Sequence, residues 1–216
     1  MLTFANPKSF SYFFILKLTL MNLIERVKNM IITPKTEWQK ISAEPQPMGT
    51  VLTTYVVPLA LVGAVATFIG YGFIGYEVFG YKVVGIEWGW RWALIQFITA
   101  LVGVIATAYV VDALAPSFGS EKNIDRSTQL VAYGYTPAFV GAIFNIFPVI
   151  ALLGSLLALY GIYVMYLGFT PMKKTPEDKR ITYFIVCILV LIAIYVVIGI
   201  ILGNVFGTRF TSTSYR

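Results

Sequence analysis

The sequence predicts an all-α integral membrane protein: a bundle of five transmembrane helices preceded by an amphipathic interfacial helix. Hydrophobic residues make up 58% of the 216 residues and charged residues 12%, whereas a soluble domain carries about 25% charged residues. The stretch from Gln129 to Phe169 contains no Asp, Glu, Lys or Arg. Its roughly 40 residues are twice what one helix needs to cross about 30 Å of hydrocarbon, so the chain must turn around inside it.

Composition also excludes several kinds of catalytic site. The chain has no histidine, which removes His-based acid–base catalysis, Ser-His or Cys-His nucleophile pairs and nearly every transition-metal site. The single cysteine, Cys187, lies in an apolar run and cannot form a disulfide within one chain. We therefore expect no catalytic residue, no metal and no cofactor. The net charge of +6 indicates an orientation signal facing anionic lipid and not affinity for nucleic acid.

Residues 1–20 differ in character from the segment that follows. They form an apolar run interrupted by Lys17, and no small-residue cleavage site follows, as a signal peptide would require. Met21 then begins a coherent segment. We interpret residues 1–20 as an extension upstream of the physiological start, with an interfacial anchor as the alternative.

Residues 21–47 are the predicted amphipathic lead-in, on the cytoplasmic side or at the membrane interface. The apolar residues of its first part fall on one helical face: Leu23, Ile24, Val27, Met30 and Ile31. Arg26 and Lys28 lie on the other face, and we expect them to point towards lipid phosphates. Pro34 suits the first turn of a second short helix, in which Trp38 is expected to be an interfacial anchor.

The first two spans are expected at residues 51–74 and 90–114. Pro58 lies inside the first span and should kink it. Between the two spans, a loop carries aromatic residues typical of an interfacial belt: Tyr76, Tyr81, Trp88 and Trp90. Asp112 lies in the last turn of the second span, where an acidic residue opposes the helix macrodipole and needs a partner or water. A solvated or structural role and a functional role both remain open for it.

The third and fourth spans form the predicted hairpin, with its turn at Asn145 to Pro148, because Pro148 suits a helix start. Tyr133, Pro137 and Asn145 add polar or helix-breaking groups to the third span. Small residues form one stripe on each of the two spans: Gly134, Ala138, Gly141 and Asn145, then Gly154, Ala158, Gly161 and Gly168. Such stripes allow close helix approach in lipid, so we expect them to face each other or to seat the first and last spans.

The fifth span is expected at residues 181–206 and completes a membrane domain at 48–207, followed by a short tail at 208–216. A GxxxGxxxG ladder near its end suits either a homodimer face or packing within the chain: Gly199, Gly203 and Gly207. In the loop before the third span, Ser127 or Thr128 is expected to be the helix N-cap.

The distribution of Lys and Arg predicts the orientation of the five spans. The N-terminal side and the loops on that side carry most of them: Lys8, Lys17, Arg26, Lys28, Lys35, Lys40, Lys122, Arg126, Lys173, Lys174, Lys179 and Arg180. The opposite side has only Lys82, Arg91, Arg209 and Arg216. This ratio of roughly three to one favours a cytoplasmic N-terminus and an exoplasmic C-terminus.

Three stretches resemble one known family. They are the lead-in MNLIERVKNMIITPKTEWQKI, the core LVAYGYTPAFVGAIFNIFPVIALLGSLLALYGIYVMYLGF and the following TPMKKTPEDKR. From Met21 to about Phe206 the chain resembles the Yip family of polytopic membrane proteins, in its shorter, bacterial-type form. The positions that match its recurrent pattern are Tyr133, Pro137, Pro148 and the YLG at Tyr166 to Gly168.

The resemblance implies a topology of five spans with a cytoplasmic N-terminus, in the inner (plasma) membrane of a bacterium. Eukaryotic members of the family share a DLYGP motif and are associated with Rab-type GTPases and vesicle traffic. This sequence has DALAP at Asp112 to Pro116 in place of that motif, which argues against GTPase binding. For bacterial-type members the family implies no assigned reaction.

Two functions from different classes are compatible with these features. The first is a non-enzymatic scaffold or adaptor that presents residues 21–47 to membrane lipids, to a membrane-protein partner or to a second copy of the chain. The alternative is a small transporter or channel subunit that moves an ion or small solute, suggested by Pro58 and Pro137 and by the polar Asp112, Tyr133 and Asn145. A membrane enzyme is disfavoured because a catalytic pair is hard to assemble without histidine.

Overall fold

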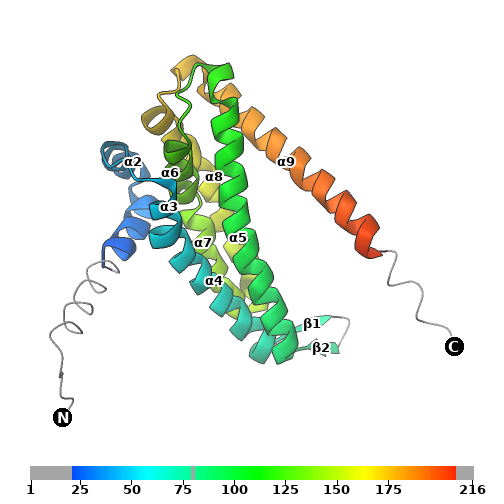
Figure 1. The fold of residues 1–216 in the computed structure, drawn as a ribbon. Coiled ribbons are helices and arrows are strands. Elements are labelled where there is room, and N and C mark those ends of the chain that lie inside the picture. The colour runs from blue at the N-terminus through cyan, green and yellow to red at the C-terminus, as the bar shows by residue number, and fades with distance from the viewer. Residues whose placement is uncertain (1–20, 79–80, 208–216) are drawn as a thin grey trace, which may run out of the picture.

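The chain folds into a helical bundle with short helices at one end and a small β-hairpin at the other (Figure 1). This computed structural model describes residues 21–78 and 81–207, without the side chains of 78, 194, 195 and 197–207. Residues 1–20, which we interpret from the sequence as an upstream extension, and the tail at 208–216 lie outside the described part. The predicted helical class is confirmed, with one addition, since the hairpin makes the fold not purely α.

The lead-in consists of a helix at residues 21–32 and of α2, Pro34–Ala43. Pro34 begins α2 as expected. The prediction of Trp38 as an interfacial anchor is wrong: its side chain is 1% exposed, and its Nε1 donates a hydrogen bond of 2.8 Å to the carbonyl oxygen of Val164. Trp38 packs on the bundle together with Met30 and Ile41, so the indole finds its acceptor inside the protein.

The first long helical stretch is continuous from Met48 to Ile74, but its winding changes along its length. The parts are α3 Met48–Val51, the π-helical η1 Leu52–Val56, α4 Val57–Ile69 and the π-helical η2 Gly70–Ile74. Pro58 lacks an N–H, and a π-helical turn directly precedes its helix. At the position where the sequence predicts a kink, the helix changes from π-helical to α-helical winding.

A β-hairpin follows where the sequence predicts only a loop. Strand β1, Tyr76–Val78, pairs antiparallel with β2, Tyr81–Val83, and Glu77 lies opposite Lys82. The second long helix, α5, runs over Ile86–Leu114 and continues into a 3₁₀ turn, η3, at Ala115–Phe118.

The predicted third span is broken into several parts. They are α6 Ile124–Gly134, α7 Thr136–Gly141 and the 3₁₀ turn η4 Ala142–Ile146. Pro137 lies in the first turn of α7, where its missing N–H interrupts no hydrogen bond of that helix. The expected N-cap at Ser127 or Thr128 is wrong, because α6 begins one turn earlier, where the side chain of Asn123 accepts the N–H of Arg126.

The predicted turn of the hairpin is confirmed. Phe147 adopts an extended conformation between η4 and the short 3₁₀ turn η5, Pro148–Ile150. The chain then reverses into α8, Ala151–Lys173, which packs against α6 and α7.

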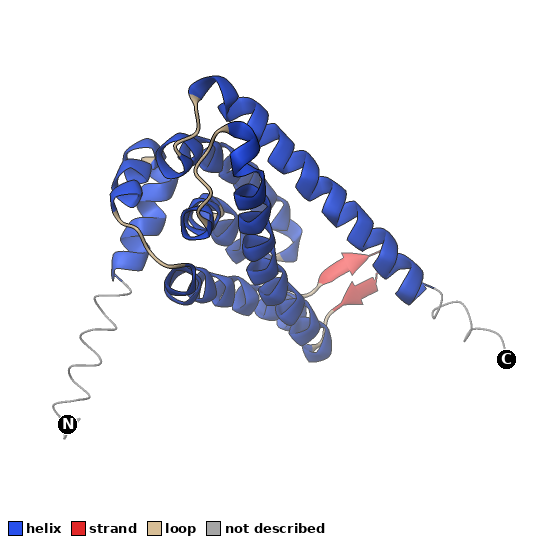
Figure 2. Cartoon of the chain, turned by 45° about the horizontal axis from the view of Figure 1, so that its top comes forward, coloured by secondary structure: helices blue, strands red, loops and turns tan. Residues whose placement is uncertain are grey.

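The last helix, α9, covers Glu177–Gly207 and contacts α5 and α8. Tyr183 and Phe184 attach its first half to the bundle through edge-on ring contacts with Phe169 of α8. Beyond them α9 diverges from the other helices, as both views show (Figures 1 and 2).

Three helical stretches of the described chain are long and apolar enough to cross a membrane: Met48–Ile74, Ile86–Phe118 and Pro148–Lys173. The broken segment from α6 to η4 is not among them.

We expect Gly141→Ala to destabilise the packing of α7 against α8, because the added methyl group would lie 2.5 Å from the carbonyl oxygen of Gly154. Overpacking of this kind costs about 1–3 kcal/mol. The measurement is the midpoint of thermal unfolding in a mild detergent. Gly49→Ala is the matched control, since a methyl group there meets no atom within 4 Å. Equal midpoints for the two variants would contradict the close approach of the helices.

Candidate functional site at the α2 end of the bundle

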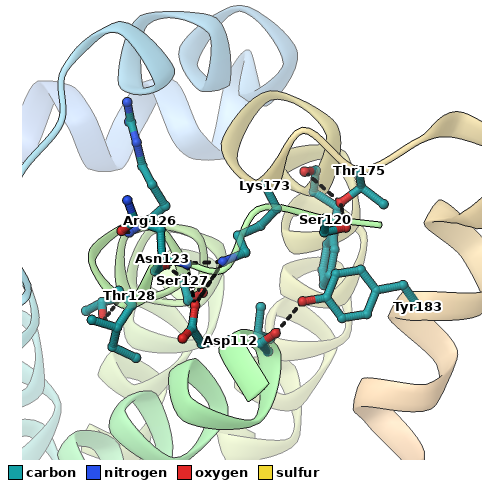
Figure 3. A network of polar contacts seen from close by, with 12 residues as sticks. Asp112, Ser120, Asn123, Arg126, Ser127, Thr128, Lys173, Thr175 and Tyr183 are labelled. Atoms are coloured by element: carbon teal, nitrogen blue, oxygen red, sulfur yellow. Dashed lines mark hydrogen bonds and ion pairs between the residues drawn. The ribbon is translucent and has the colours of Figure 1, made fainter. Parts of the chain in front are cut away.

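A buried ion pair joins the ends of three helices at the α2 end (Figure 3). The ammonium of Lys173, whose side chain is 0% exposed, lies 3.1 Å from a carboxylate oxygen of Asp112, which is 8% exposed. The same ammonium donates to the hydroxyl of Ser127 at 2.6 Å and to the carbonyl oxygen of Asn123 at 3.2 Å. An ammonium has three N–H donors, and these three acceptors satisfy them. We call Asp112, Asn123, Ser127 and Lys173 the polar network.

The polar network also provides hydrogen-bond partners and favourable charges for the helix ends from which its residues come. The Asp112 carboxylate accepts the backbone N–H of Asn123 at 2.7 Å and the hydroxyl of Ser127 at 3.0 Å, both at the start of α6. A carboxylate is favourable at a helix N-terminus, which offsets its unfavourable place at the C-terminus of α5. Lys173 in turn lies at the C-terminus of α8, where a cation is favourable.

The sequence predicts a partner or water for Asp112, and the structure supplies a partner, because the carboxylate is held in an ion pair with Lys173. Sequence reasoning treated Lys173 only as a charge in the following loop and missed its role. The one sequence feature that could have indicated this role is the position of Lys173 at the very end of an apolar run, one helical turn after Phe169.

A polar groove lies between the lead-in, the start of the first long helix and α6. Its volume is about 650 Å³. We call it the Arg26 groove; it is lined by Asn22, Leu23, Glu25, Arg26, Asn29, Glu37, Lys40, Glu44, Gln46, Thr50, Thr54, Tyr55 and Tyr133.

Arg26 is held inside this groove by two carboxylates. Its guanidinium lies 2.6 Å from Glu37, which is 3% exposed, and 2.5 Å from Glu44. Burial alone would lower the pKa of Arg26, but the Glu44 and Glu37 carboxylates outweigh it and raise that pKa above its ordinary value. The sequence predicts that Arg26 points to lipid phosphates; instead its charge is already neutralised within the protein, while Lys28 is exposed.

Two tyrosines form the aromatic wall of the groove. The ring of Tyr133 lies 4.5 Å from that of Tyr55, and the Arg26 guanidinium lies 5.9 Å from the Tyr133 ring. The Tyr133 hydroxyl donates to the side-chain oxygen of Gln46 at 3.3 Å. The Tyr55 hydroxyl shares a hydrogen bond of 2.6 Å with Thr136.

Helix α6 connects the groove to the polar network. Its Asp125 accepts the backbone N–H of Met48 at 2.7 Å, and its Gln129 donates to the carbonyl oxygen of Glu44 at 2.8 Å. Helix α6 therefore holds the lead-in in place, and its own first turn is held by Asp112 and Lys173.

The other residues singled out from the sequence lie elsewhere. Asn145 donates to the hydroxyl of Thr67 at 3.0 Å, beside the hairpin turn that Pro148 begins. Pro137 is buried at the start of α7. The structure thus brings Tyr133 into the groove and Asp112 into the network, but it does not unite these five residues in one site.

The glycine stripes lie at helix contacts. Gly141 faces Gly154, and Gly161 faces the backbone oxygen of Gly134 and the ring of Pro137. Gly134 also packs against Met165. Gly168 lies against Leu130 and the ring of Trp38. The three glycines of the ladder lie in the part of α9 whose side-chain surroundings are not described: Gly199, Gly203 and Gly207.

The described residues contain no group of three or more His, Cys, Asp or Glu side chains that could hold a metal ion. What the α2 end offers chemically is a rigid polar surface with both signs of charge and two tyrosine rings.

Comparisons with known proteins agree with this architecture. The family model described as the Yip1 domain matches residues 28–207. The inner membrane protein YohC of Escherichia coli strain K12 is 22% identical over 155 residues, which cover 69% of this chain and 80% of YohC. YohC of Escherichia coli O6:H1 matches with the same identity and coverage. No solved structure matches the chain significantly.

Removing one partner of the Asp112–Lys173 pair should destabilise the protein by about 3–5 kcal/mol, because the other charge is left buried and unpaired. Asp112→Asn and Lys173→Met test this separately, and the double variant should lose much less than the sum of the two. Unfolding in detergent is the measurement.

The matched control is the surface pair of Glu121 and Lys174, whose charged atoms lie 2.9 Å apart. Neutralising either of its members should change the unfolding midpoint little, because solvent screens the pair. Strictly additive losses at Asp112 and Lys173 would contradict the coupling.

Proposed function

The chain belongs to the Yip1 family, and we propose that it is a non-enzymatic scaffold or adaptor of a bacterial inner membrane, presenting its lead-in to a lipid or protein partner. The observation that carries this proposal is the construction of the Arg26 groove. Residues 21–47 are built into the bundle by the buried Trp38 and by Gln129, and they frame an open polar cavity. A surface that is held this firmly is suited to recognition, because little order must be gained on binding.

Charge pairing supports the non-enzymatic part of the proposal. Catalytic acids and bases need room to exchange protons with a substrate. In this chain the buried carboxylates face cations that hold the fold: Asp112 faces Lys173, and Glu37 faces Arg26.

Topology is a further part of the proposal. In this proposal the three long apolar stretches, the broken α6–η4 segment and α9 make five passages through the membrane, and the N-terminus lies in the cytoplasm. The distribution of Lys and Arg supports this orientation, and the YohC relatives, which are described as inner membrane proteins, support the location. A broken helix is tolerated at membrane depth where protein surrounds it, and α6 and α7 are largely buried.

The alternative of a small transporter or channel subunit is favoured by one observation. Asp112 and Lys173 are buried charges at helix ends, and intramembrane charges often mark transport pathways. Their location at the last turns of α5 and α8, however, supports the role of holding helix ends together.

Exchanging the signs of two exposed charges at the rim of the groove, Glu25 and Lys40, should sharply reduce partner binding. We expect Glu25→Lys combined with Lys40→Glu to reduce co-purification of partners from native membranes by about tenfold or more, because like charges then meet across the interface. Mass spectrometry after mild-detergent purification is the measurement. Lys82→Glu, on the β-hairpin, is the control, and equal partner recovery from both variants would refute the proposal.

The proposed topology predicts the accessibility of single cysteines. In a Cys187→Ala background, Lys82→Cys should react with a membrane-impermeant maleimide on intact spheroplasts. Lys28→Cys should react only after the membrane is permeabilised, because it lies on the cytoplasmic side. Labelling of Lys28→Cys from outside would invert the orientation.

A further inference from the structure

We propose that the Arg26 groove binds the zwitterionic headgroup of a phospholipid that carries a primary ammonium, of the ethanolamine type. The inference rests on the proposed function, because it takes the groove as the surface that is presented for recognition, and it names the ligand chemistry.

The depth of the groove is the first argument. Thr50, Thr54 and Tyr55 line it from the first two turns of the stretch Met48–Ile74, which is long and apolar enough to cross a membrane. The end of a membrane-spanning helix lies at the level of the lipid headgroups. An open polar cavity of about 650 Å³ at that level is within the range of about 300–1,000 Å³ typical of ligand sites.

The balance of charges is the second argument. Three carboxylates line the groove, on Glu25, Glu37 and Glu44, against two cations, on Arg26 and Lys40. Arg26 is bound by two of the carboxylates, so it does not offer a free charge to an anionic headgroup. The groove is therefore net acidic, which favours a ligand with a cationic group over one with only a phosphate.

Exposure decides which of these groups remain available to a ligand. The Glu44 side chain is 48% exposed and pairs with Arg26 through one oxygen only, and Glu25, which lines the same groove, is exposed. These carboxylates can accept N–H donors from an ammonium. Lys40, whose side chain is 60% exposed, lies 3.4 Å from one carboxylate oxygen of Glu37, and its other N–H donors can meet the phosphodiester. Acceptors for the cation and a donor for the anion thus line the same cavity.

Hydrogen-bond chemistry distinguishes related headgroups. A primary ammonium has three N–H donors, whereas a trimethylated ammonium has none and can use only its charge and the tyrosine rings. A lipid with a glycerol headgroup is net negative, so the acidic rim of the groove repels it. The expected order of affinity is therefore ethanolamine, then choline, then glycerol.

The test uses the full chain, delipidated in mild detergent and titrated with short-chain phospholipids bearing ethanolamine, choline or glycerol headgroups. Native mass spectrometry reports the bound lipid. We expect the ethanolamine lipid to bind roughly tenfold more tightly than the glycerol lipid, as one charge-assisted hydrogen bond would give. Soluble glycerophosphoethanolamine is a further arm: strong binding without acyl chains would overturn the lipid as the source of the headgroup.

Glu25→Gln combined with Glu44→Gln is the decisive variant. It changes the formal charge of the groove from net acidic to net basic, so the preference should move towards the glycerol lipid. Glu121→Gln, which removes an exposed carboxylate elsewhere, should leave the order unchanged. Glu25→Gln alone, at an exposed position, should shift the preference in the same direction if the double variant does not fold.

Equal binding of the three lipids, or an order that the double variant leaves unchanged, would overturn the inference. Loss of a co-purifying protein partner in the charge-reversed variant, together with no headgroup preference, would make the groove a protein-docking surface. That result would refute the lipid ligand and leave the proposed adaptor function standing.

Discussion

A fully buried ammonium must donate all its hydrogen bonds to acceptors of the protein, and Lys173 imposes this requirement on three helices at once. Its acceptors come from the last turn of α5 and the first turn of α6, while Lys173 itself ends α8. The start of α6 is therefore fixed in space. Because α6 also carries Gln129 and Tyr133 to the lead-in, the geometry of the Arg26 groove depends on the same buried charge.

Much of the fold could be predicted from hydropathy and from the positions of proline. The long apolar segments and the turn before Pro148 follow from the thickness of a bilayer and from the missing N–H of proline. The break at Tyr135 has a signal in Pro137, which lies in the first turn of the next helix, but none in hydropathy, because the apolar run continues across it. The β-hairpin was missed for a different reason: three residues in each strand are too few for an alternating pattern to stand out.

The site was predictable only in part, because pairing between distant residues leaves no local pattern. Asp112 could be recognised as an acidic residue at an unfavourable helix end, but its partner lies 61 positions away. Arg26 illustrates a second limit. An amphipathic helix has the same sequence pattern whether its apolar face meets lipid or protein. Only the bundle determines that Trp38 turns inward and that Arg26 turns to Glu37 and Glu44.

The hydrogen bond between Trp38 and Val164 joins residues 126 positions apart, and this separation has a consequence for biogenesis. A ribosome delivers the lead-in first and α8 much later. Until α8 has entered the membrane, the indole of Trp38 has neither its acceptor nor the surface around Gly168 against which it packs. The lead-in is therefore among the last segments of the described chain to reach its native position, although it is made before the helices it packs against.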